Sequence, residues 1–106
     1  MNRQQFLRLV EPAIVLVDRK GKDYNSGPTL GQYFPFGDAS YIQMIHLKAL
    51  RLVAIAPKGS QVNFESKRDS TLDLINYCVF YLAHLDAQEL RSVAVAATIT
   101  APSSCN

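Results

Sequence analysis

The sequence predicts an all-α protein, folded as an antiparallel bundle of three or four helices similar in size to one small domain. Three segments carry apolar residues at helical spacing, and two stretches rich in glycine and proline separate them. The chain has 106 residues, of which 48% are hydrophobic and 19% charged, as is typical of a globular domain with its own core. We therefore expect one helical domain over 1–106, with a long loop at 24–39 and a flexible tail at about 101–106.

The first predicted helix rests on an apolar stripe formed by Leu9, Ala13, Leu16 and Val17. Pro12 must either begin this helix or kink it, because proline lacks the N–H that a helix interior uses. The run AIVLV also suits a strand, but no alternating partner strand lies nearby. A helix is the preferred interpretation, and the cluster RKGKDYNSG at 19–27 ends it and opens the loop.

The second predicted helix begins near Ser40, which has the spacing of a capping box with Gln43. One stripe of its surface is apolar and comprises Ile42, Ile45, Ala49, Leu52 and Val53. Pro57 ends the helix, because proline cannot continue the hydrogen-bond ladder.

The third predicted helix has the strongest signal and runs from about Lys67 to Arg91. Its apolar positions recur at steps of three and four and are Leu72, Ile75, Val79, Leu82 and Leu85. The following run SVAVAATITA fits either a continuation of the helix or a short strand. A helix that is apolar nearly all round belongs at the centre of a bundle. It also leaves more apolar surface than one small bundle covers, so we expect a homodimer or larger homo-oligomer.

Composition and charge exclude several classes of protein. The net charge of +2 is too small to indicate a nucleic-acid binder, and no apolar run is long enough to span a membrane. The N-terminal residues do not have the pattern of a signal peptide. Cys78 and Cys105 are lone thiols, which suits a reducing compartment, so we expect a cytoplasmic location.

The candidate functional residues form an acidic stripe on the third predicted helix. Glu65, Asp69, Asp73 and Asn76 follow at steps of four, four and three, which places them on one helix face. Three carboxylates on one face repel one another unless Mg²⁺ or basic side chains lie between them. Asp69 is equally well explained as a favourable charge near a helix N-terminus. Asp73 lies deeper in an apolar helix, where an unpaired charge is costly, so it predicts a functional site or a buried network.

Cations and aromatic rings that could complement this stripe lie elsewhere in the chain. Lys48 and Arg51 stand in the otherwise apolar second helix, which favours a pairing with the acids or with phosphate. The rings of Tyr33, Phe34 and Phe36 lie in the predicted loop. They offer faces on which a nucleotide base can stack, although packing over the bundle is the alternative use of such rings.

Three segments together resemble a known family. KDYNSG, SYIQMIHLKALRL and ESKRDSTLDLINYCVFYL resemble the nucleotide modification associated domain, type one, over roughly residues 8–85. This family consists of small phage and bacterial proteins related to the all-α MazG-like nucleotide pyrophosphohydrolases. The resemblance implies a MazG-like helical bundle that forms oligomers and acts on a nucleotide or cyclic nucleotide, in the host cytoplasm if a phage encodes it.

The resemblance also implies roles for individual residues. As an enzyme, the protein would use Glu65 and Asp73 in catalysis and would hold Mg²⁺ with Glu65, Asp69 and Asp73. The residues expected to bind substrate are Lys22, Asp23, Tyr24, Lys48, Arg51 and Asn76.

Two other functions stay open beside the enzyme. MazG-type enzymes place acidic pairs on two facing helices, whereas the segment YIQMIHLKALRLVAIA contains no Asp or Glu. The first alternative is therefore a non-catalytic protein that binds a nucleotide signal and sequesters it, as a phage counter-defence sponge would. The second is an interaction protein whose polar stripe only fixes the register of the bundle.

Overall fold

A computed structural model describes the backbone over 1–26, 29–57 and 61–100, and side chains over 1–19, 29–57 and 67–97. These residues form four helices and no strand, so the prediction of an all-α bundle is confirmed. The helices are α1 (Arg3–Ser26), α2 (Leu30–Tyr33), α3 (Asp38–Ile55) and α4 (Gln61–Thr100). Over the described residues, no helix combines the length and the apolar character that crossing a membrane requires.

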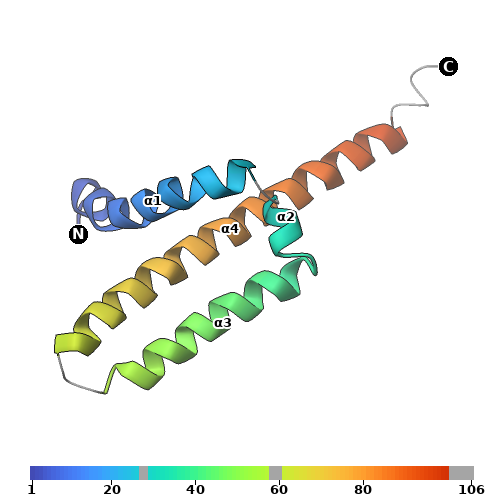
Figure 1. Ribbon diagram of the computed structural model, residues 1–106. Coiled ribbons are helices and arrows are strands. Elements are labelled where there is room, and N and C mark those ends of the chain that lie inside the picture. Colours follow the sequence, from blue (N-terminus) through green and yellow to red (C-terminus); the bar gives the residue numbers. More distant parts are fainter. Residues whose placement is uncertain (27–28, 58–60, 101–106) are drawn as a thin grey trace.

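Helix α4 is the central element of the fold. α3 packs against it along an extended antiparallel contact, and α1 lies along another side of α4 (Figure 1). With 40 residues, α4 is about 60 Å long, and its C-terminal part projects beyond the other helices (Figure 1). The run SVAVAATIT therefore continues the helix, which decides the alternative that the sequence left open.

Side-chain caps explain why two of the helices begin where they do. The Asn2 side chain accepts a hydrogen bond from the Gln5 N–H, and the Gln5 side chain accepts from the Asn2 N–H, both at 2.9 Å. This reciprocal cap starts α1 at Arg3, so Pro12 lies inside α1 and does not begin it. Thr29 and Gln32 form the same arrangement at the start of α2.

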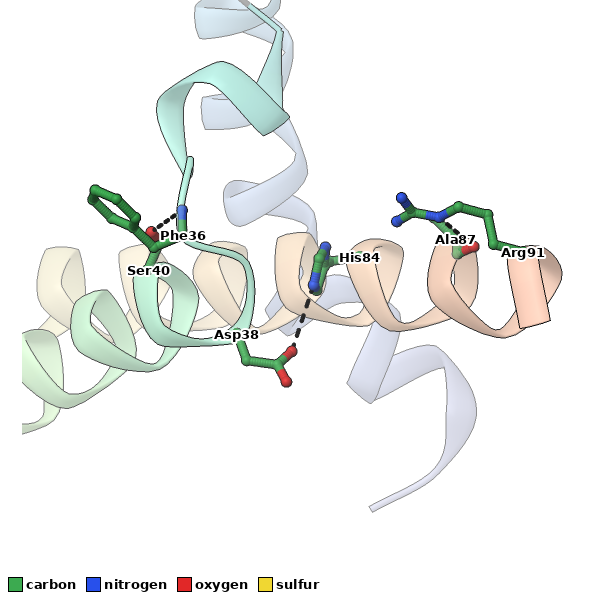
Figure 2. Close-up of polar contacts among 6 residues, drawn as sticks. All are labelled: Phe36, Asp38, Ser40, His84, Ala87 and Arg91. Atoms are coloured by element: carbon green, nitrogen blue, oxygen red, sulfur yellow. Dashed lines mark hydrogen bonds and ion pairs between the residues drawn. The ribbon is translucent and has the colours of Figure 1, made fainter. Parts of the chain in front are cut away.

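The expected loop at 24–39 is shorter in the structure, because α1 continues through Ser26 and α2 forms within the segment. The prediction that Ser40 begins the second helix with a capping box is wrong. α3 begins earlier, at Asp38, after Gly37 in a positive-φ conformation of 59° that favours glycine. The Ser40 hydroxyl instead accepts a hydrogen bond from the Phe36 N–H at 3.0 Å, which fixes the turn before α3 (Figure 2).

Few side chains are fully buried in this fold. Among the described side chains, those of Ala13, Tyr41, Ser70 and Leu72 are buried. Tyr41 belongs to the contact between α3 and α4, and its ring lies against rings of α4. The seam between α3 and α4 is therefore the best-packed part of the chain, and the candidate site lies along it.

Candidate functional site

An ion pair joins α3 and α4 in the middle of their seam. Lys48 Nζ lies 3.2 Å from Asp73 Oδ2. The two side chains are 22% and 29% exposed, so solvent and solutes still reach the pair. The prediction that Asp73 faces a basic group on the neighbouring helix is confirmed, with Lys48 as the partner. Such a half-buried pair holds each charge in place until a stronger ligand competes for one of them.

A groove of about 370 Å³ opens beside this pair. Aromatic and polar side chains line it together, and they are Tyr33, Phe34, Phe36, Ser40, Gln43 and Tyr77. Phe36 is 81% exposed, an unusual position for a phenylalanine ring. Ring faces combined with hydroxyl and amide groups suit a flat, polar, aromatic ligand.

The groove and the ion pair are neighbours along the seam of α3 and α4. Met44 of α3 and Tyr77 of α4 line the groove. Lys48 lies one turn beyond Met44, and Asp73 lies one turn before Tyr77. Because the two helices run antiparallel, both steps lead in the same direction along the seam, by about 6 Å. The groove and the ion pair are therefore about one helical turn apart.

A stack of aromatic rings holds Phe34, one of the residues that line the groove. The rings of Phe34 and Tyr41 stack with centroids 4.4 Å apart, and those of Tyr41 and Tyr81 stack at 5.8 Å. Burial raises the pKa of Tyr41 above its usual value. Because Tyr41 is buried between its neighbours, Phe34 is held in place at the wall of the groove.

Asp38 fastens the start of α3 to α4. Its carboxylate lies 3.5 Å from Nε2 of His84, and Figure 2 marks this contact between the two side chains. Burial raises the pKa of Tyr81, and the charge of Asp38 raises it further. The Nε2 atom is buried and has no hydrogen-bond partner among the described residues, so the Asp38 carboxylate is the group that faces it.

Sequence reasoning missed this Asp38–Tyr81–His84 cluster. Tyr81 and His84 are one turn apart on α4, and that spacing alone was visible in the sequence. Nothing local indicates that Asp38 meets them, because the contact spans more than forty residues of chain.

The other predicted site residues fall into two groups. Asn76 is half-buried, whereas Asp69 and Arg51 are exposed, and among the described side chains no ion pair involves Arg51. The side chains of Lys22, Asp23, Tyr24 and Glu65 lie outside the described residues, although their backbone belongs to α1 and α4.

The expected Mg²⁺ ligands are only partly visible. Asp69 and Asp73 share a face of α4 one turn apart, and Glu65 is the third expected ligand. Within the described side chains, no three His, Cys, Asp or Glu residues gather as a metal site requires. The ammonium group of Lys48 occupies the position beside Asp73 where a cation is needed.

In comparison with known proteins, the chain matches no family model, no curated protein and no solved structure.

Proposed function

We propose that the protein binds a nucleotide or cyclic nucleotide in the seam between α3 and α4. The observation that carries this proposal is the aromatic groove lying one helical turn from the ion pair of Lys48 and Asp73. A nucleotide combines a flat base with an anionic phosphate, and these two parts match the two neighbouring halves of the site.

The base would lie in the groove. Tyr33 and Phe36 offer exposed ring faces, and Gln43 carries a side-chain amide that can both donate to and accept from a base edge. Stacking alone accepts any base, so the amide group would supply what selectivity the groove has.

The phosphate would lie at Lys48. Its ammonium group is already directed into the seam by Asp73 and remains partly exposed. Arg51 lies one turn further along α3 and supplies a second cation at the edge of the site. The half-buried Asn76, one turn from Asp73 on α4, can donate to a phosphate or sugar oxygen.

Binding without hydrolysis is the form of the proposal that the contacts favour. Asp73 is neutralised by Lys48, and Asp38, the acidic residue of α3, faces His84 and Tyr81 away from the ion pair. A protein of this kind would sequester a nucleotide signal. In the enzymatic alternative, Asp69, Asp73 and Glu65 would hold Mg²⁺, which would polarise a phosphate group for hydrolysis.

A thermal-shift panel tests the proposal. Nucleoside mono-, di- and triphosphates and cyclic dinucleotides are added at millimolar concentration, with Mg²⁺ and with EDTA. Any ligand that binds the folded state raises the midpoint of unfolding. A shift in EDTA supports sequestration. A shift that needs Mg²⁺, accompanied by release of phosphate or pyrophosphate, replaces it with the enzyme. No shift for any nucleotide overturns nucleotide binding.

Variants then locate the bound nucleotide. Lys48→Met and Asp73→Asn remove the two charges of the pair, Arg51→Ala removes the peripheral cation, and Phe36→Ala removes an exposed ring. We expect the first two to abolish the shift, and the last two to weaken it, while circular dichroism shows the helices intact. Arg8→Met is the matched control, because Arg8 is an exposed cation on α1. If Lys48→Met and Arg8→Met bind equally well, the site lies elsewhere.

A further inference from the structure

The chain exposes far more surface than a compact protein of its mass. Its accessible surface is 8237 Å², whereas a folded monomer of 11.8 kDa is expected to expose about 5,900 Å². Its radius of gyration is 18.7 Å, compared with about 13 Å for a compact chain of this length. The excess of about 2,300 Å² is of the size that one subunit buries in an obligate dimer. This area argues for a second copy of the chain as the missing partner.

One face of α4 is the surface that such a copy would cover. Ile75, Cys78, Leu82 and Leu85 follow at steps of three, four and three, which is the spacing of a helix–helix seam. Leu82 is 58% exposed, and its neighbour Val79 is 53% exposed. Leu82 lies nine residues from Asp73 and therefore half a turn around the helix. The face thus lies on the side of α4 away from α3, next to the part of α4 on which α1 packs, and covering it leaves the candidate nucleotide site open (Figure 1).

Charges at the two ends of this face are complementary. Arg68 lies at the N-terminal end, and Asp86 and Glu89 lie at the C-terminal end, all of them exposed. The position halfway between Arg68 and these acids along α4 is Cys78. If a second α4 packs antiparallel with its two-fold axis at Cys78, each Arg68 meets the acids of the other copy. A parallel arrangement would instead bring like charges together, which is unfavourable.

A groove of about 380 Å³ between α1 and α4 adjoins the same face. Leu9 of α1 and Leu72 and Ile75 of α4 line it, together with Lys67, Arg68 and Thr71. In the antiparallel arrangement, the projecting half of the partner's helix passes along this groove. Its apolar residues meet the apolar floor, and its acids meet the two cations.

We propose that two copies associate through this face of α4, as an antiparallel helix pair with its two-fold axis close to Cys78. Such an interface is isologous, so each contact occurs twice. Ile75 then faces Leu82 of the partner subunit, and Arg68 faces Glu89 of the partner subunit. The proposal is independent of what the α3–α4 seam binds.

Cross-linking at Cys78 tests the position of the axis. In a Cys105→Ser background, Cys78 is the single cysteine, and the structure shows it as a free, exposed thiol. Mild oxidation or a short bis-maleimide is expected to convert most of the protein to a covalent dimer. The control carries Cys78→Ser and Gln88→Cys as well, which places the two thiols about 30 Å apart in the proposed dimer. Equal cross-linking of both proteins would overturn the proposed axis.

Sedimentation equilibrium on reduced protein tests the interface itself. The unmodified chain is expected to sediment at twice 11.8 kDa at micromolar concentration, and Leu82→Glu at 11.8 kDa. Because Leu82 is exposed in the single chain, circular dichroism should show Leu82→Glu still helical. Arg68→Glu should weaken association at least tenfold, and Arg68→Glu with Glu89→Arg should restore it. A monomeric unmodified chain, or association that none of these changes affects, would overturn the proposal.

Discussion

Lys48 and Asp73 meet across the seam of α3 and α4, with Nζ 3.2 Å from Oδ2. Both side chains are between a fifth and a third exposed. The pair therefore lies where its charges are held but not sealed from a ligand. We expect this position to give the pair a measurable effect on stability.

A double-mutant cycle measures the coupling within the pair. Lys48→Met, Asp73→Asn and the double variant are unfolded in urea, and the free energies of unfolding are compared. We expect a coupling energy of about 0.5–1 kcal/mol, because the pair is partly exposed and partly screened. The double variant should lose less stability than the sum of the losses in the two single variants, and the difference is the coupling energy. Additive effects would show that the two charges do not interact in solution.

Tyr41 is predicted to be a main determinant of stability. Its side chain is 4% exposed and stacks on both Phe34 and Tyr81. Tyr41→Ala should lower the free energy of unfolding by about 3–5 kcal/mol, because it leaves a cavity between α3 and α4. Phe36→Ala removes a ring that is 81% exposed and should change stability by less than about 0.5 kcal/mol. Similar losses for both variants would contradict the packing described for this seam.

Ala13 marks the close approach of α1 to α4, since it is 1% exposed. Ala13→Leu should destabilise the protein by about 1–3 kcal/mol, because the larger side chain has no space there. Ile14→Leu, at a neighbouring position that is 48% exposed, is the matched control and should be nearly neutral. Chemical denaturation of both variants checks the docking of α1, which a neutral Ala13→Leu would refute.

The raised pKa of Tyr81 predicts that the protein loses stability at alkaline pH. Its pKa is raised above the ordinary value of 10.0 by burial and by the Asp38 carboxylate. The folded state therefore keeps the Tyr81 proton at a pH where the unfolded chain releases it. The resulting stabilisation is complete below pH 10 and falls as the pH rises toward the raised value. Urea midpoints between pH 8 and 11 should decline less steeply for Tyr81→Phe than for the unmodified chain, and parallel declines would contradict this.

Much of the architecture could be predicted from local patterns. The apolar periodicity of 72–85 and the stop at Pro57 identified α4 and the end of α3, because burial and the missing proline N–H act locally. The pairing of Asp73 was expected because a charge in an apolar stripe needs a counter-charge. Lys48 and Arg51 were both candidate partners, and the structure pairs Asp73 with the half-buried Lys48, whereas Arg51 is exposed.

Other features needed the tertiary structure or a closer reading of the sequence. Thr29 and Gln32 form a capping box, and Ser40 and Gln43 have the same spacing without forming one. Spacing alone therefore could not show which pair caps a helix. In the structure Gly37, with its positive φ, is the N-cap residue, and α3 begins at Asp38, two residues before Ser40. The contact of Asp38 with His84 depends on how the two helices slide against each other, which no local pattern encodes.

The packing of α3 against α4 is more extensive than that of α1, and this difference has a consequence for motion. The two helices, α2 and the turn between α2 and α3 supply the described residues of the groove, the ion pair and the Asp38 cluster, and none of these residues belongs to α1. Local opening of α1 then requires less free energy than global unfolding. Amide hydrogens of α1 should exchange with solvent earlier than those of α3, while α3 and α4 keep their native arrangement.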